Sequence, residues 1–220
     1  MTPAQRRVAR VRASQAAAKA SPGQPLVGSA YELMLAKLAA DKRRLNDVQS
    51  IVRKVEIKRE ILPEYGNWVE SVLASGRGGQ DDVLTTVMIW HVDAGHYEQA
   101  LDIAEYVLRH GLTLPDQYQR DVPTVLVDEV SDAALAAQRQ DTPIDLNLLL
   151  RLESMTEGLD MPDQARARLH KAIGIGAKAA GDLPVARKHL ERALQLHSGA
   201  GCKRDLAEVD RIMKKQEAKA

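Results

Sequence analysis

Residues 75–96, SGRGGQDDVLTTVMIWHVDAGH, decide how this chain folds, because they combine the signals that the rest of the sequence repeats. Three glycines in four residues precede two adjacent aspartates, and an apolar run then leads to Gly95. Glycine commonly ends helices, whereas carboxylates favour the first turn of a helix. We therefore predict that one helix ends at Gly76 and that Asp81 and Asp82 lie in the first turn of the next helix.

A phosphate-binding loop is the other function that a glycine-rich segment suggests. A Walker-type loop needs a lysine and a hydroxyl residue after its last glycine, and a β-strand before its first. Residues 76–81 contain no lysine and follow no strand pattern, and the two aspartates would repel a phosphate. The glycines therefore indicate a hinge between helices.

The same punctuation divides the whole chain of 220 residues into helices. Proline and glycine clusters recur from residues 22–25 to residues 199–201, and roughly eight or nine amphipathic segments lie between them. Alternating β-branched runs are absent, phenylalanine is absent, and aromatic residues make up 3% of the chain. We predict an all-α, multi-helix protein without a stretch that is apolar enough to cross a membrane.

The first long helix begins with a recognisable cap. Ser29-Ala-Tyr-Glu32 has the spacing of a capping box, which predicts a long N-terminal helix over residues 29–62. Apolar residues recur on this helix with heptad spacing, which is typical of a coiled-coil seam. The predicted oligomerisation residues are Leu38, Leu45, Val48, Val52 and Val55. Asp41 and Arg59 interrupt the seam, so a helix that packs only on its own domain is the alternative.

Two segments share a pattern that is typical of helical hairpins. Residues 94–100, AGHYEQA, and residues 180–186, AGDLPVA, both place a glycine before a helix and an alanine five residues after that glycine. Small residues where two helices touch and glycine at the turn are features of tetratricopeptide units. We predict tetratricopeptide-like hairpins at both places, but two units 86 residues apart do not make a solenoid.

Formal charge is segregated along the chain, although its total is only +1. It is +8 over residues 1–60, −13 over residues 61–161 and +6 over residues 162–220. This pattern favours a polyanionic partner for the ends and another partner, or self-association, for the middle, although solvated helix faces also differ by chance. The predicted regions are a basic arm and linker (1–28), the long helix, a candidate for oligomerisation and DNA contact (29–62), an acidic helical core (63–161) and a basic C-terminal hairpin region (162–220).

Clustered lysine and arginine side chains predict salt-sensitive binding to DNA phosphates that is largely independent of sequence. The predicted DNA-binding residues are Arg6, Arg7, Arg10, Arg12, Lys19, Lys42, Arg43, Arg44, Arg53, Lys54, Lys58 and Arg59. A secondary set comprises Lys203, Arg204, Arg211, Lys214 and Lys215. Tyr31 alone among the aromatic residues is interleaved with them, so base stacking is not expected.

The sequence predicts no catalytic residue and no metal site. Asp81 and Asp82 are weak candidates, because adjacent helix positions point about 100° apart and chelate one ion poorly. The six histidines lack the spacing of a zinc protease, and we expect His189 and His197 to face solvent or to cap helices. The single cysteine, Cys202, excludes an intrachain disulfide and indicates a reducing compartment. No cofactor is expected, except Mg²⁺ if the protein is a nuclease.

Four segments together resemble the small terminase subunit of peduovirus-type tailed phages. They are MTPAQRRVARVRAS (1–14), YELMLAKLAADKRRL (31–45), KREILPEYGNWVESVLASGRGGQDDVLTTVMIWHVDAGHYEQALDIAEYVLRHGLTLP (58–115) and MPDQARARLHKAIG (161–174). The resemblance covers nearly the whole chain in order. Its most distinctive part is the Gly-Gln-Asp-Asp string and the TVMIWHVDAG that follows.

The resemblance implies a role in a DNA-packaging motor. Such a subunit binds double-stranded viral DNA near the cohesive-end site, forms a homo-oligomer, expected to be a ring, and delivers DNA to a large ATPase subunit in the host cytoplasm. Proteins of this kind are also called the terminase endonuclease subunit, but no active-site motif accompanies that name here. A metal-dependent endonuclease that cuts the concatemer and a helical-hairpin adaptor that binds protein without DNA are the alternatives.

Overall fold

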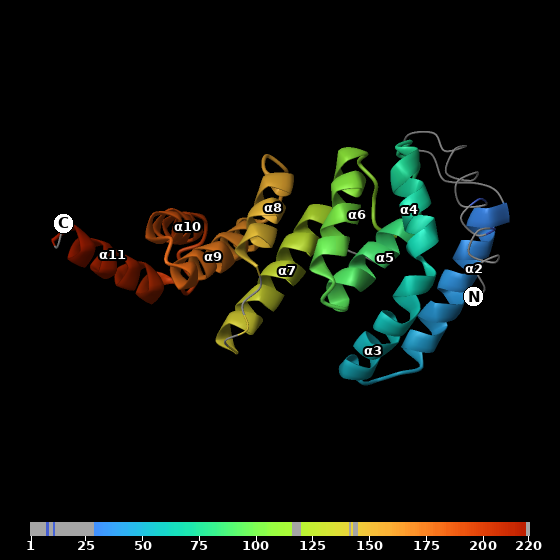
Figure 1. The fold of residues 1–220 in the computed structure, drawn as a ribbon, viewed down its shortest axis with the longest axis horizontal. Helices are drawn as coiled ribbons and strands as arrows, with labels where there is room; N and C mark the ends of the chain where they lie inside the picture. Colours follow the sequence, from blue (N-terminus) through green and yellow to red (C-terminus); the bar gives the residue numbers. More distant parts are fainter. Residues whose placement is uncertain are drawn as a thin grey trace. The chain divides into compact units, whose positions relative to one another are not determined.

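The computed structural model describes Val8, Val11 and residues 29–115, 120–140, 142 and 145–218. Every regular element in this part of the chain is helical, which confirms the all-α prediction (Figure 1). The chain forms two compact units, Met1–Val122 and Pro123–Ala220, and each is described by itself. None of the described helices combines the length and apolar character that a membrane crossing requires.

The first unit is built around one buried helix. Its described elements are α2 (Ser29–Asn46), α3 (Ile51–Ile61), the short 3₁₀ helix η1 (Leu62–Glu64), α4 (Gly66–Ser75), α5 (Asp82–Asp93) and α6 (Tyr97–Arg109). Nine of the twelve residues of α5 are buried, and α2, α3, α4 and α6 all contact it. Tyr31 of α2 also stacks on Trp68 of α4, with 5.8 Å between ring centroids. The apolar run after Asp82 thus forms the centre of this core.

The prediction of one long helix over residues 29–62 is wrong, because α2 ends at Asn46 and α3 begins at Ile51. Ser50 caps α3, since its side chain accepts a hydrogen bond from the backbone N–H of Arg53 at 3.3 Å. The chain turns back here, and α2 and α3 lie beside each other (Figure 1). Arg44 and Glu60 therefore form an ion pair at 2.7 Å, although a continuous helix would separate them by about 24 Å.

The predicted seam residues do not share one exposed face. Leu38 and Leu45 belong to the core of the first unit, with 3% and 6% of their surface exposed. Val48 and Val55 are half-buried, whereas Val52 is 71% exposed. A role of these residues in oligomerisation stays a prediction, and Val52 is the seam residue most accessible to a partner.

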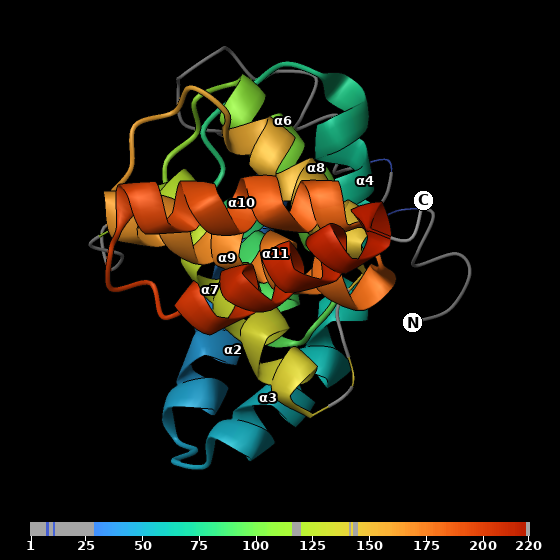
Figure 2. The ribbon, with the colours of Figure 1, turned by 90° about the vertical axis from the view of Figure 1, so that its left-hand side faces the viewer.

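The second unit contains α8 (Leu146–Thr156), α9 (Asp163–Ala180), α10 (Leu183–Leu196), α11 (Lys203–Glu217) and, from its second residue onward, α7 (Val122–Arg139). Helices α9 and α10 approach closely at Gly174, where a Cβ atom would lie 2.7 Å from Cγ of Leu190. Helix α11 packs on α10 (Figure 2). Val209 of α11 joins Leu190 and Cys202 in one buried cluster. The absence of a Cβ atom at Gly174 thus allows the close approach of α9 and α10, which form the most extensive helix contact in this unit.

Helical hairpins form at both predicted places. Helices α5 and α6 are joined through Gly95, and α9 and α10 through Gly181, both with the positive φ that glycine adopts easily. Ala100 and Ala186 are completely buried after these turns, where small residues were predicted. The likeness of these hairpins to tetratricopeptide units stays a prediction.

Candidate functional site

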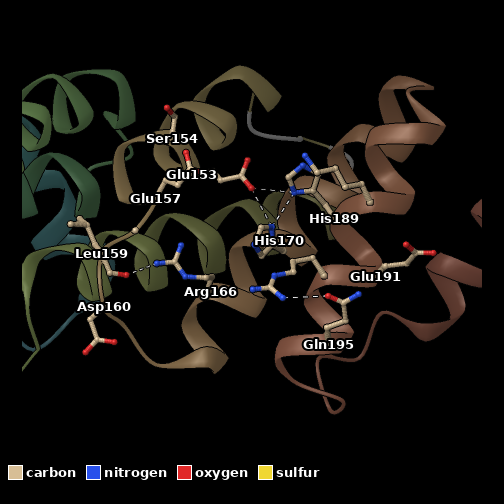
Figure 3. Close-up of a pocket in the computed structure, with 13 residues that line it drawn as sticks. Glu153, Ser154, Glu157, Leu159, Asp160, Arg166, His170, His189, Glu191 and Gln195 are labelled. Carbon is tan, nitrogen blue, oxygen red and sulfur yellow. Dashed lines mark hydrogen bonds and ion pairs between the residues drawn. The ribbon is translucent and has the colours of Figure 1, made fainter.

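A pocket of about 880 Å³ opens in the second unit where α8, α9 and α10 meet (Figure 3). Its lining residues are Glu153, Ser154, Glu157, Gly158, Leu159, Asp160, Arg166, His170, Lys188, His189, Glu191, Arg192 and Gln195. Three of them, one from each helix, direct their side chains toward one another: Glu153, His170 and His189. We call these three residues the His–Glu cluster.

The ligand-type atoms of the cluster converge on one point. The Nδ1 atoms of His170 and His189 lie 3.0 Å apart. Oε1 of Glu153 lies 3.4 Å from Nδ1 of His170 and 3.6 Å from Nδ1 of His189. The histidine side chains are 12% and 5% exposed, whereas that of Glu153 is 29% exposed. The carboxylate therefore forms the side of the cluster that is most open to water.

Burial governs the protonation of the cluster. It lowers the pKa of His170 to about 4, and the neighbouring His189 and nearby cations act in the same direction. Burial also lowers the pKa of His189, with a further contribution from Lys188. For Glu153 burial raises the pKa, while Lys188 opposes the rise. Both imidazoles are therefore neutral at pH 7 and keep a lone pair for a hydrogen bond or a metal ion.

Arg166 fixes the edge of the pocket between α8 and α9. Its guanidinium donates hydrogen bonds to the carbonyl oxygens of Thr156 at 3.2 Å and Leu159 at 2.6 Å. Thr156 is the last residue of α8 and Leu159 lies in the connection that follows, so the arginine holds this connection to α9 in place. Lys188 and Arg192 of α10 line the pocket as well, so three cationic side chains lie in the surroundings of the cluster.

Sequence reasoning missed this cluster. The expectation that His189 faces solvent or caps a helix is wrong, because His189 is 4% exposed and faces His170. His197, in contrast, is the C-cap residue of α10, as expected. The zinc-protease spacing applies to two histidines on a single helix. Glu153, His170 and His189 come from three different helices, which only the tertiary fold brings together.

Asp81 has a structural task in the first unit. It is the N-cap of α5, and its Oδ1 accepts the backbone N–H groups of Val83 and Leu84, each at 2.9 Å. Its Oδ2 accepts the indole N–H of Trp68 at 2.8 Å. The helix therefore begins where it was predicted, with Asp82 in its first turn and the completely buried Asp81 as its cap. Among the described residues, Asp81 and Asp82 join no group of side chains that could hold a metal ion.

Ion pairs and hydrogen bonds occupy much of the predicted DNA-binding set on α2 and α3. The engaged cations are Arg44 with Glu60, Arg53 with Glu56, Lys58 with Asp93, and Arg59 with the backbone carbonyl of Ala94. Lys42, Arg43 and Lys54 form no ion pair within the part of the chain that the structure describes, and Arg43 is the exposed one of these three.

The secondary set lies on one face of α11. Lys203, Arg204, Arg211, Lys214 and Lys215 are all exposed, and we call them the α11 stripe. At about 100° per residue they fall within an arc of about 120°, opposite the face that carries Val209. Three of the four acids of α11 pair with other helices: Asp205 and Glu208 with Lys178, and Asp210 with Arg187. No ion pair engages the stripe within the described residues.

Five predicted DNA-binding residues lie outside the described residues. They are Arg6, Arg7, Arg10, Arg12 and Lys19. Their assignment to DNA binding stays a prediction from the sequence.

Comparison with known proteins identifies the family. A family model for the phage small terminase subunit matches residues 35–164. The chain is 42% identical over 214 residues to the "Terminase, endonuclease subunit" of Escherichia phage P2, covering 97% of this chain and 86% of that protein. It is 23% identical over 104 residues to the "Probable terminase, endonuclease subunit" of Haemophilus phage HP1 (strain HP1c1), covering 47% of this chain and 37% of that protein. This chain belongs to the phage small terminase subunit family, which confirms the resemblance and places it in phage genome packaging.

Proposed function

We propose that this subunit binds double-stranded viral DNA near the cohesive-end site, assembles into a homo-oligomer, expected to be a ring, and delivers the DNA to the large terminase ATPase subunit in the host cytoplasm. The α11 stripe is the observation that carries DNA binding. Its five cations are exposed, and none of them forms an ion pair with another described residue.

The geometry of the stripe suits a phosphate backbone. From Lys203 to Lys215 the helix rises about 18 Å, a length over which duplex DNA carries about ten phosphate charges. Lysine and arginine side chains are long enough to reach several of these phosphates from one helix face. The contacts would be electrostatic, so affinity would fall steeply with salt and depend little on base sequence. The exposed cations near the α2–α3 turn would extend this surface in an assembled oligomer.

Self-association and the large subunit require other surfaces. The exposed Val52 at the start of α3 supports a role of this helix end in contacts between copies. The acidic charge of −13 over residues 61–161 would repel DNA and supports a protein partner for the middle of the chain. We assign the large subunit to this acidic region.

A mobility-shift assay tests DNA binding directly. Purified full-length protein is mixed with duplex DNA that carries the phage's own genome-end sequence, once with Mg²⁺ and once with EDTA. We expect a shifted and uncut duplex in both lanes, and a weaker shift when Lys203, Lys214 and Lys215 are changed to glutamine. No shift at low salt would overturn the proposal and favour the protein-binding adaptor.

A metal-dependent endonuclease is the second candidate function, and the His–Glu cluster favours it. The relative of this chain from phage P2 is named an endonuclease subunit. Imidazole and carboxylate groups in a pocket are also suited to metal-assisted hydrolysis. Cleavage products that appear with Mg²⁺ or with Zn²⁺ and vanish with EDTA would establish this second function. The Asp81→Ala change is a poor test of cleavage, because Asp81 stabilises the core.

A further inference from the structure

The His–Glu cluster has the dimensions of a metal site with three protein ligands. A Zn²⁺ ion binds imidazole nitrogen and carboxylate oxygen at about 2.0–2.2 Å, so tetrahedral ligand atoms are about 3.3–3.6 Å apart. The three separations in the cluster are 3.0, 3.4 and 3.6 Å, which lie near this range. An ion at their centre would need only small side-chain movements.

We propose that Glu153, His170 and His189 bind one divalent transition-metal ion of the Zn²⁺ class. Two imidazoles and one carboxylate suit Zn²⁺, Co²⁺ or Ni²⁺, whereas Mg²⁺ and Ca²⁺ prefer ligand sets made of oxygen. The set is also that of catalytic zinc sites, in which three protein ligands leave the fourth position to water or substrate. This inference goes beyond the proposed DNA-binding function and does not depend on it.

The backbone around the cluster is arranged before any ion arrives. His170 lies one helical turn before Gly174, and His189 immediately precedes Leu190, so the close contact of Gly174 with Leu190 brings the two imidazoles together. Helix α8 packs against α9 and supplies Glu153. Because packed helices carry all three ligands, little conformational entropy is lost when the ion binds.

The pocket would leave one coordination position of the ion open. Glu153 is the most exposed of the three ligands, and the pocket of about 880 Å³ leaves room for a water molecule or an anion beside it. Arg166, Lys188 and Arg192 line the same pocket together with the carboxylates of Glu157, Asp160 and Glu191, so both signs of charge surround the cluster. The fourth ligand would therefore be water from the pocket.

Metal titration of the full-length protein tests the site. The protein is first treated with EDTA and dialysed, and Zn²⁺ is then added in competition with a chromophoric chelator. We expect one tight equivalent, and Co²⁺ in its place should give the visible absorption of a tetrahedral nitrogen–oxygen site. His170→Gln, His189→Gln and Glu153→Gln should each weaken Zn²⁺ binding by about 100-fold or more. His197→Gln is the matched control on α10 and should bind as the parent does.

Two further measurements distinguish loss of the metal site from loss of the fold. Circular dichroism confirms that each variant is folded, and the Zn²⁺-induced rise in melting temperature should vanish in the three ligand variants but persist in His197→Gln. Equal Zn²⁺ affinity in parent and ligand variants, or no tight equivalent in the folded parent, would overturn the site. The α11 stripe stays intact in all these variants, so loss of the metal site and loss of DNA binding are distinguishable.

Discussion

At the residue scale, Asp81 joins two helices through one buried carboxylate. It caps α5 with one oxygen and holds Trp68 of α4 with the other. Gly76 ends α4 in the left-handed conformation, with φ of 62°, so the chain reverses between the two helices. A charged group is tolerated in this core because three N–H donors replace the water that it loses.

Changing Asp81 to alanine should lower the free energy of unfolding by about 3 kcal/mol. Loss of an N-cap costs about 1–2 kcal/mol, and a buried indole N–H without an acceptor costs about 1–3 kcal/mol more. Urea denaturation measures the difference. Asp82→Ala is the matched control, since Asp82 is only half-buried and should cost less than about 1 kcal/mol. Equal losses in the two variants would contradict the assigned role of Asp81.

Asp81 should also give the protein an unusual pH dependence. Burial raises the pKa of Asp81 from 3.8 to about 6, although the N–H groups of Leu84, Trp68 and Val83 oppose the rise. Between these two values the folded state binds more protons than the unfolded state, so this group's contribution to stability falls as pH rises from about 4 to 6. Comparing urea midpoints of the parent and Asp81→Asn across this interval isolates the effect. A parallel pH profile in the variant would rule it out.

At the element scale, glycine and proline predicted the helix ends well, and the missed break shows why other ends are harder. Residues 46–50, NDVQS, contain neither glycine nor proline, and heptad spacing continues across them. The local signal for the start of α3 was Ser50, but serine also occurs inside helices and does not by itself mark an N-cap. The break forms because α2 and α3 each bury apolar residues against α5, which one straight helix could not do.

The contact between α9 and α10 gives a prediction about packing. Gly174→Ala would place a methyl group 2.7 Å from Cγ of the fully buried Leu190 and 3.2 Å from the carbonyl oxygen of Ala186. Overpacking of this kind costs about 1–3 kcal/mol, which exceeds the gain of up to about 1 kcal/mol in helix propensity. Thermal unfolding should show a lower melting temperature.

Gly176→Ala is the matched control on the same helix. Its Cβ atom would lie 3.3 Å from the side-chain nitrogen of Gln138, which a small side-chain movement relieves. We expect this variant to be as stable as the parent or slightly more stable. If both alanine variants unfold alike, the close approach at Gly174 does not set the helix spacing.

At the scale of the whole molecule, the sequence revealed the surface better than it revealed the pocket. Segregated charge and helical periodicity pointed to Lys203 and its neighbours, because surface charge is visible without a tertiary structure. The His–Glu cluster stayed hidden because His170 and His189 are 19 residues apart on different helices, and Glu153 comes from a third. No spacing rule within one helix covers such a set, so only the packing of α8, α9 and α10 reveals it.

Self-association gives the next prediction, which rests on the proposed function. Ile51 and Val52 are 78% and 71% exposed at the start of α3, where apolar side chains contribute little to the fold of one copy. Replacing both with glutamate should weaken self-association by at least about tenfold, which is about 1.4 kcal/mol, and leave the melting temperature nearly unchanged. Light scattering after size exclusion measures the mass. An unchanged oligomer in the double variant would place the contact elsewhere.

The salt dependence of DNA affinity tests which surface carries the DNA. If the α11 stripe contacts phosphates, removing Lys203, Lys214 and Lys215 should reduce the slope of log affinity against log salt by up to about 2.7, since each lost contact removes about 0.9. Changing Arg77, Arg109 and Arg139 to glutamine is the control, because these three exposed cations change the net charge equally but lie in the acidic middle. Net charge alone would alter both slopes by the same amount. A reduction of the slope in the α11 variant alone would show that the stripe itself contacts the phosphates. If the slopes of the two variants are equal, DNA binding belongs to the N-terminal arm or to the α2–α3 turn.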